Sequence, residues 1–415
     1  MTGAWALAEF AASLSSTEGV LPGSTAVLLA DYLTLAGRTH GGGEINLARA
    51  MTAAVRASAG DADDVHWDSL VHPGAIIWPV VLEVGLSRRS SGPEISRAAR
   101  VGYEAMVRLG VVLAPLAAQG HHLTALVGGV GAAAAASVLL DGEVSTDALG
   151  HALSVAGGSS GALVERSGTR SFHRGQAVLS GLAAALEAQR GLVSTRGDLE
   201  RGGGVLPQLS SSAAEMLGLD YDALATTSVR PFPTSGWNHP AYEAAIEAAR
   251  DVNGPIRSIE ISVHERTRSA SSMSLHSPSD EWSHLGHSVA RAVASIRQDQ
   301  SVCELLAIVT LAGRIEPGAR VTLATSGGVC RADVLVPLGH PQRPLNVSDL
   351  ARKWSMPVMG AGNFLASVER WLADPRPRDL AELVATISAP QRLHSRSSYA
   401  HRLGRTHPRL VSGTK

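Results

Sequence analysis

Residues 61–74 hold the densest group of polar side chains, inside a region that is otherwise apolar and rich in small residues. Four aspartates and two histidines occur there: Asp61, Asp63, Asp64, Asp68, His66 and His72. A carboxylate beside an imidazole orients and charges the ring, which titrates near pH 7, so this composition suits proton transfer at neutral pH. Two other interpretations stay open: a solvated loop between helices, and a magnesium site, because spaced aspartates suit a hard cation.

Two further histidines and two arginines are candidates for the same chemistry. His121 and His122 follow Gly120 and precede an Ala-rich segment, where a histidine could either enter a cavity or bond to the backbone at a helix end. Adjacent histidines point apart, so this pair lacks the spacing of a metal site. Arg170 and Arg230 could each bind a carboxylate through two parallel hydrogen bonds, although a surface salt bridge is the commoner role of an arginine.

The composition narrows the class of protein. The chain has 415 residues, of which 45% are hydrophobic and 18% charged, so it is globular and long enough for two domains. A formal net charge of -1 lacks the basic excess that nucleic-acid binding needs. Two cysteines without a Cys-x-x-Cys pair argue against a thiolate metal site. The sequence shows no signal-peptide or membrane-span pattern, so we expect a cytoplasmic protein with no membrane or nucleic-acid partner.

Apolar segments predict the helices that must position these residues. Aromatic residues make up 4% of the chain while alanine and glycine are abundant, which favours close helix packing over a β-sandwich. Helices are predicted over residues 24–36, 92–119, 129–141, 175–190, 280–299, 348–358 and 361–374.

The pattern changes in the C-terminal part, because no strong strand pattern occurs before about residue 255. Alternating apolar residues predict strands over 258–267 and 319–325, and the turn after the second strand predicts a β-hairpin. A helix-plus-sheet unit is therefore expected over about residues 230–345. The basic tail, 391–415, is expected to be partly disordered.

Several short motifs occur in a characteristic order. They are Asp61–His66 with His72-Pro73-Gly74, Gly102-Tyr103-Glu104 with Arg108-Leu109-Gly110, Gly120–Thr124, Arg170–Ala177, Arg230–Pro233, Gly339-His340-Pro341 with Pro344-Leu345, and Lys353-Trp354. In this order and spacing they resemble the motifs of the MmgE/PrpD family. The resemblance covers nearly the whole chain.

The resemblance implies a mainly α fold, with a large all-helical domain and a smaller α+β lid domain. Residues 1–229 would form the helical domain, with C-terminal helices of about 366–415 packing back on it, and residues 230–365 would form the lid. The active site would lie between the domains of a homodimer that acts on a small molecule without a metal or organic cofactor. Family members remove a proton α to a carboxylate or carbonyl, and then lose water, lose carbon dioxide or return the proton to the other face.

Carried over residue by residue, the resemblance implies three catalytic residues. His122 would be the general acid/base, His72 its partner across the cavity, and Asp61 would orient and charge a neighbouring histidine. Arg170 and Arg230 would bind a carboxylate or carbonyl oxygen of the substrate. The remaining substrate-side positions are expected to be Val65, His66, His173 and His287.

Some of these positions depart from the family's usual residues. Arg170 and Arg230 stand where relatives usually carry lysine, and an arginine effectively cannot donate a proton. Val65 replaces a threonine, Gly236 replaces an arginine, and His287 aligns with a tyrosine. This loss of polar groups argues against a citrate-like tricarboxylate and favours a larger or less charged substrate.

Three hypotheses about function follow. The first is a lyase or isomerase in a specialised biosynthetic pathway, which eliminates, decarboxylates, epimerises or cyclises a compound beside a carbonyl, and the retained histidines favour it. The second is a catalytically dead relative that binds a ligand or a partner, which the lysine-to-arginine changes fit. The third is a magnesium-dependent helical enzyme that uses the aspartates.

Overall fold

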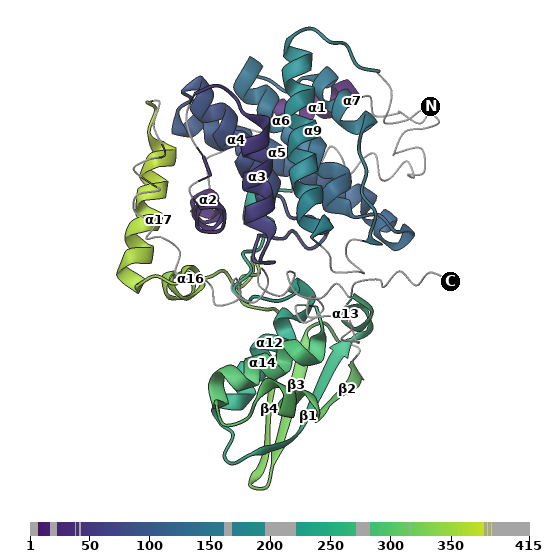
Figure 1. Cartoon of the computed structure of the whole chain (residues 1–415), viewed down its shortest axis with the longest axis vertical. Helices are drawn as coiled ribbons and strands as arrows, with labels where there is room; N and C mark the ends of the chain where they lie inside the picture. Colours follow the sequence, from purple (N-terminus) through teal and green to yellow (C-terminus); the bar gives the residue numbers. More distant parts are fainter. Residues whose placement is uncertain are drawn as a thin grey trace, which may run out of the picture.

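The computed structural model describes the greater part of the chain. The described residues are 7–16, 23–37, 39–40, 43–161, 168–195, 221–270, 283–314, 316–376, 380 and 383. Figure 1 shows two parts, a bundle of helices above a smaller unit of strands and helices. Each part has its own cluster of buried apolar side chains. The described residues are therefore mainly α with a smaller α+β unit, as predicted from the sequence.

The helical part is formed mostly by the first half of the chain. Its elements there are α1 (Leu7–Ser15), α2 (Gly23–Ala36), α3 (Leu47–Ser58), α4 (Gly74–Arg88), α5 (Gly92–Leu113), the 3-10 helix η1 (Ala114–Gln119), α6 (Leu123–Asp141), α7 (Thr146–Ser154) and α9 (Thr169–Gln189). The helices predicted at 24–36, 92–119, 129–141 and 175–190 correspond to α2, α5 with η1, α6 and α9.

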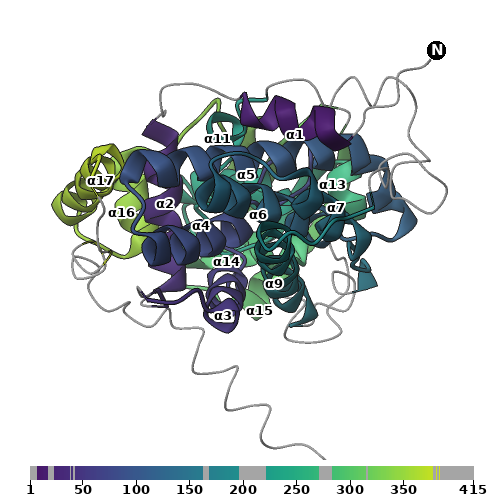
Figure 2. The same cartoon turned by 90° about the horizontal axis from the view of Figure 1, so that it is seen from above.

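Helix α6 is the central element of this bundle. It packs against α4, α5, α7 and α9, and Figure 2 shows it among these neighbours. Glycines allow α6 and α9 to approach closely, because a Cβ added at Gly181 would lie only 2.3 Å from the carbonyl oxygen of Gly129. The predicted close packing of small residues is confirmed at this contact.

Two segments of the bundle are long and apolar enough to cross a membrane by length and composition, residues 92–119 and α6. In their most apolar windows, 72% and 89% of the residues lie buried inside the molecule. The partners that bury them are other helices of the same chain, as is typical of core helices.

The smaller unit is a four-stranded sheet with helices. Its elements are the 3-10 helix η2 (Gly236–Asn238), α12 (His239–Arg250), β1 (Ile256–His264), α13 (Glu265–Ala270), α14 (Leu285–Arg297), α15 (Val302–Leu306), β2 (Val309–Arg314), β3 (Ala319–Thr325) and β4 (Gly328–Val334). The strand order is β2-β1-β3-β4, with β2 parallel to β1 and the other pairs antiparallel. The predicted hairpin is confirmed, since β3 and β4 pair as far as the turn at Thr325 and Gly328.

One face of this sheet carries the second core. The alternating residues Ile259, Ile261 and Val263 of β1 are buried with apolar side chains from α12 and α14. The predicted strand 258–267 ends at His264, because α13 begins at the next residue. Strand β2 was not predicted, since its sequence VTLAGR lacks a clear alternation and is only half-buried.

The chain then returns to the helical part through α16 (Val347–Trp354) and α17 (Val358–Ala373). Leu350, Trp354 and Phe364 belong to the helical core, which also contains α11 (Ala223–Thr226). Helix α16, which lies inside the predicted range 230–365, thus buries its apolar face in the first core, and the domain limits stay predictions. The tail 391–415 lies outside the described residues.

Candidate active site

Most of the aspartate-rich loop between α3 and α4 is buried, although Asp68 is exposed. Asp61, Asp63, Asp64 and His66 are all at most 5% exposed, so the interpretation of this stretch as a solvated loop is wrong. Asp61 adopts a left-handed backbone conformation with φ 54°, which turns the chain sharply after α3. The loop is thus folded inward, and its carboxylates need internal partners.

Asp64 anchors the far end of this loop. Its carboxylate accepts hydrogen bonds from the backbone N–H of Gly74, at 2.9 and 3.1 Å, and from the Tyr103 hydroxyl, at 2.7 Å. Burial raises the pKa of Asp64 to about 7, although the hydrogen bonds from Tyr103 and Gly74 act in the opposite direction. Asp64 therefore titrates near neutral pH.

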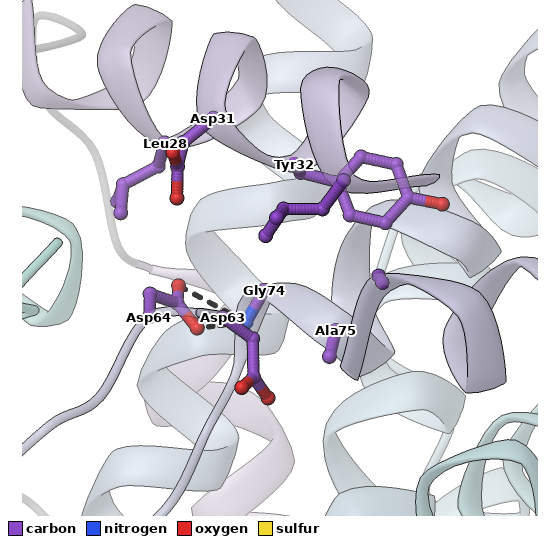
Figure 3. A pocket seen from close by; sticks show the side chains of 9 residues that line it. Leu28, Asp31, Tyr32, Asp63, Asp64, Gly74 and Ala75 are labelled. Atoms are coloured by element: carbon purple, nitrogen blue, oxygen red, sulfur yellow. Dashed lines mark hydrogen bonds between the residues drawn. The ribbon is translucent and has the colours of Figure 1, made fainter. Parts of the chain in front are cut away.

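A small internal cavity lies beside Asp64. It is bounded by α2 and by the start of α4, and it has room for about one water molecule. Figure 3 shows the carboxylates of Asp31 and Asp64 on its opposite sides, while the Asp63 carboxylate points away from it. This cavity is thus a polar space behind the loop and is too small for an organic substrate.

Two aspartates of the loop pair with three arginines. Arg170 donates from Nη2 to Oδ2 of Asp61 at 2.5 Å, and Arg230 hydrogen-bonds both the carboxylate and the backbone carbonyl of Asp63. Arg174 places its Nε 3.0 Å from Oδ2 of Asp63. Burial would raise the pKa of Asp61, but Arg170 and Arg230 outweigh it and hold this pKa below its ordinary value. Asp61, Arg170 and Arg230, three of the predicted site residues, therefore lie together.

This pairing also bears on the magnesium hypothesis. The carboxylates of Asp61 and Asp63, which would have to bind the cation, face guanidinium groups instead. Across the described part of the chain, no group of three His, Cys, Asp or Glu side chains is arranged to hold a metal ion. The donor set therefore does not fit a hard cation at this loop.

His72 is oriented by the loop itself. Its Nδ1 lies 2.6 Å from the backbone carbonyl of Asp64. A carbonyl can only accept, so Nδ1 must carry the proton and Nε2 must carry the lone pair. Burial, followed by the charges of Arg174 and Arg230, holds the pKa of His72 well below its ordinary value. His72 is consequently neutral at pH 7, with Nε2 able to accept a proton.

His122 lies at the N-cap position of α6, where its backbone N–H donates to Gly158 at 3.0 Å. Its side chain is buried, and its Nδ1 lies 3.0 Å from Nδ1 of His173, so one of the two nitrogens carries the shared proton. Burial, followed by the charges of Arg174 and of His72, holds the pKa of His122 well below its ordinary value. The His72 and Arg174 side chains both approach Oδ2 of Asp63, at 3.9 and 3.0 Å, and both contribute to lowering the pKa of His122.

The remaining predicted positions differ in their contacts. Val65 pairs with Ser228 through backbone hydrogen bonds in both directions. The Nδ1 of His66 bonds to the Ser69 hydroxyl at 2.8 Å, within its own loop. His287 lies in the first turn of α14, where its backbone N–H donates to Nδ1 of His284. The substrate-side roles of Val65, His66 and His287 stay predictions.

Sequence reasoning missed Arg174 and the role of Lys353. Arg174 follows Arg170 by one helical turn on α9, so the two side chains share a face, and this spacing could have indicated it. Lys353 donates to Asp31 at 2.6 Å and to the carbonyl of Ala62 at 2.9 Å. Only the tertiary fold brings Lys353 to the loop, so no local pattern could have given this contact.

Comparison with known proteins adds one match. The family model described as the MmgE/PrpD N-terminal domain matches residues 41–216. This span contains Asp61, His72, His122 and Arg170, and it ends before Arg230. No curated protein matches the chain.

Proposed function

Because the chain belongs to the MmgE/PrpD family, whose members are generally lyase-type enzymes, we propose that it removes a proton α to a carboxylate or carbonyl group of a small organic molecule. Dehydration, decarboxylation, epimerisation or cyclisation would follow from the resulting enolate. The reaction needs a base, an acid and cations that face the developing negative charge.

The observation that carries this proposal is the fixed tautomer of His72. The hydrogen bond from Nδ1 to the Asp64 carbonyl leaves Nε2 unprotonated. Nearby arginines disfavour protonation of the ring, so the base stays free at neutral pH. His72 is partly accessible, with 19% of its side chain exposed. It would take the α proton at Nε2.

The pair of His122 and His173 would handle the second proton. The two rings share one proton between their Nδ1 atoms, and their centroids are 5.2 Å apart. A shared proton lets His122 change between its two neutral tautomers while His173 compensates. His122 can therefore donate to a leaving group or return a proton to carbon, which Arg170 and Arg230 cannot do.

The arginines supply the positive charge. Arg170 is the most accessible of the three, with 22% of its side chain exposed, whereas Arg230 is almost fully buried. Arg170 would meet a substrate carboxylate first, and Arg230 would keep Asp63 and the loop backbone in place. Asp61 would hold the Arg170 guanidinium in a fixed direction through the 2.5 Å bond.

An aromatic pair supports a larger and less charged substrate. A Cβ at Gly236 would lie 2.6 Å from the Trp67 ring, so this chain cannot carry the family's arginine there without moving the tryptophan. Trp67 packs edge-to-face on Trp237, with ring centroids 5.9 Å apart, and both residues are only half-buried. Apolar aromatic surface thus stands where relatives present a cation.

The competing hypothesis is a catalytically dead member that binds a ligand or a partner. The replacement of the family's lysines by Arg170 and Arg230 favours it, because these positions have lost a titratable amine. The lid role of residues 230–365, the homodimer and the cytoplasmic location are further proposals that rest on the family resemblance.

Deuterium exchange distinguishes these hypotheses. The full chain in heavy water is offered a panel of carboxylates and β-carbonyl compounds, including citrate, methylcitrate and cis-aconitate, and mass spectrometry follows deuterium uptake. We expect one class of compound to take up deuterium. The H122A substitution should lower the rate of uptake by about 100-fold or more. H151A is the matched control, since His151 lies in α7 and bonds only to the Leu192 carbonyl among the described contacts.

Either of two results would contradict the proposal. One is that no member of a broad panel exchanges, which would favour the binding-protein hypothesis. The other is that a folded H122A exchanges as fast as H151A, which would remove His122 from the mechanism. Circular dichroism of each variant shows whether the fold is intact.

A further inference from the structure

Arg174 is a fully buried arginine that the family motifs do not single out. Its side chain is 0% exposed, and its Nη1 donates to the backbone carbonyl of Arg170 at 3.1 Å. Within the described residues, its Nη2 has no hydrogen-bond partner, and its Nε approaches Asp63 without the geometry of a hydrogen bond. Such donors are rarely left unused in a folded protein, which points to a ligand that completes the group.

The charges around Arg174 do not balance. Arg170, Arg174 and Arg230 contribute three positive charges, whereas Asp61 and Asp63 contribute two negative ones. Arginine keeps its proton in proteins, so the excess charge cannot disappear by deprotonation. A buried positive charge without a counter-ion is costly. The cluster is therefore built to accept one more negative charge.

The position of Arg174 relates that charge to the proposed base and acid. His173 precedes it on α9, and Asp63 and Arg170 are its direct neighbours. Its Nε and Nδ1 of His72 both approach Oδ2 of Asp63, at 3.0 and 3.9 Å, and after burial its charge contributes most to lowering the pKa values of His72, His122 and His173. The guanidinium thus lies close to all three imidazoles.

We propose that Arg174 is a further catalytic residue, whose free Nη2 binds the carbonyl or carboxylate oxygen that becomes negatively charged when the α proton leaves. This inference rests on the proposed function and deepens it. The C–H bond breaks and its proton goes to Nε2 of His72. Its electron pair forms the carbon–carbon double bond of the enolate, and the π pair of the carbonyl moves to oxygen. Arg174 stabilises that oxygen with a charge-assisted hydrogen bond.

An anion-binding measurement tests the site without any need for turnover. Isothermal titration calorimetry compares the full-length wild type, R174Q, R174K and R190Q with oxalate, maleate and fumarate, which are small dicarboxylate dianions. Arg190 is the matched control, because it lies at the end of the same helix with 68% of its side chain exposed. R174Q should weaken the tightest dianion by about tenfold or more, R174K should restore part of the affinity, and R190Q should have no effect.

Two outcomes of the titration would overturn the proposal. Either none of the three dianions binds the wild type, or R174Q binds them as tightly as R190Q. Thermal unfolding checks each variant. If R174Q does not fold, the R174K variant is used instead, because it keeps a positive charge but loses the fork-shaped donor set of arginine. Dianion binding by R174K as tight as that by R190Q would then contradict the proposed role of Arg174.

The pH profile separates catalysis from a purely structural role. His122 is faced by His72 from the loop and by Arg170, His173 and Arg174 from α9. His72 is faced by Arg174, Arg230, Asp61 and the Asp64 carbonyl, and by Asp63, whose Oδ2 lies 3.9 Å from its Nδ1. Removing the Arg174 charge makes both rings easier to protonate. R174Q should therefore slow exchange and move the acid limb of its pH profile to higher pH, and an unmoved limb would assign Arg174 to structure alone.

The proposal and the proposed function can fail separately. If dianions bind through Arg174 and no compound exchanges deuterium, the anion site is supported and the proposed carbon-acid reaction is contradicted. If a compound exchanges deuterium equally fast with the wild type and with R174Q, the proposed reaction is supported and the catalytic role of Arg174 is contradicted.

Discussion

At the scale of single residues, Asp64 is the carboxyl whose titration should be easiest to detect. Its side chain is buried between Gly74 and Tyr103, and its backbone carbonyl orients His72. Burial makes the protonated carboxyl the favoured form up to about pH 7. The residue whose backbone carbonyl orients the proposed base thus carries a side chain that is sensitive to pH in the neutral range.

Asp64 should make stability depend on pH with a defined sign. The folded pKa of about 7 lies above the ordinary value of 3.8, so the folded state binds the proton more tightly. This contribution is fully present below about pH 4 and is lost as the pH rises through 7, by up to roughly 4 kcal/mol. Relative to D64N, the free energy of unfolding of the wild type should therefore fall between pH 4 and 8.

The comparison with D64N is needed because buried histidines act in the opposite direction. Burial lowers the pKa values of His66 to about 4 and of His239 to about 3. These depressed values add stability as the pH rises from 4 toward 6.5 in both proteins. Urea unfolding of each protein across this pH range gives the difference, and a constant difference would show that Asp64 does not titrate there.

The sequence singled out most residues of the candidate site but not the contacts between them. The family motifs pointed to Asp61, His72 and His122, and the catalytic roles of these three residues stay predictions. The resemblance did not show that Arg174 would bridge Arg170 and Asp63, since that contact depends on the depth at which α9 packs against the loop.

At the scale of elements, α16 acts as a brace for the aspartate loop. Lys353 of α16 donates both to Asp31 of α2 and to the carbonyl of Ala62, and Trp354 donates to the other oxygen of Asp31 at 2.9 Å. Lys353 and Asp31 are almost fully buried. The loop is therefore held from the C-terminal side of the chain as well as by α4.

The substitution K353M should be strongly destabilising. It leaves the Asp31 carboxylate buried without its cation, which typically costs about 3–5 kcal/mol. R352M is the matched control, because Arg352 is the preceding residue and pairs with Asp349 at a site where its side chain is 70% exposed. Its effect should be at most about 1 kcal/mol.

Urea unfolding measures both α16 variants, and the exchange assay measures their activity. K353M should also lower the exchange rate of the protein that stays folded. The Ala62 carbonyl, which Lys353 holds, lies between Asp61 and Asp63. Equal effects of K353M and R352M on stability would contradict the role of α16 as a brace.

Burial on all sides concealed helix α4 but not helix α6, whose Ala-rich run indicated a helix. Helix α4 was missed, because 13 of its 15 residues are buried and Pro79 lies inside it. A segment buried all round shows no periodicity that separates a helix from a strand. Helix α9 begins earlier than predicted, because its polar first turn, with Arg170 and His173, faces the candidate site instead of an apolar core.

At the scale of the whole molecule, two connecting segments join the helical part to the α+β unit. The backbone N–H of Val229, next to Arg230, donates to the carbonyl of Gly339 at 3.2 Å. Gly339 has φ +91°, and a Cβ there would lie 2.0 Å from the Val229 carbonyl oxygen. The outgoing and returning segments are thus packed backbone to backbone beside a residue of the site.

The division into two cores was predicted, but the point of return was not. The sequence pattern of α16 is that of an ordinary amphipathic helix. Its place in the helical part depends on the contact with Asp31, which lies more than three hundred residues earlier. A local pattern contains no information about such a distant partner. The C-terminal limit of the α+β unit therefore had to come from the structure.

The central claim is that Nε2 of His72 takes the α proton, and the substitution H72N tests it most directly. An asparagine amide can still donate to the Asp64 carbonyl in place of Nδ1, but it has no basic nitrogen. The measurement is the rate of deuterium incorporation into the compound that the wild type exchanges, with thermal unfolding as the control for the fold. We predict a loss of about 100-fold to 10,000-fold for a stably folded H72N. A folded H72N that exchanges deuterium within about threefold of the wild-type rate would contradict the assignment of His72 as the base.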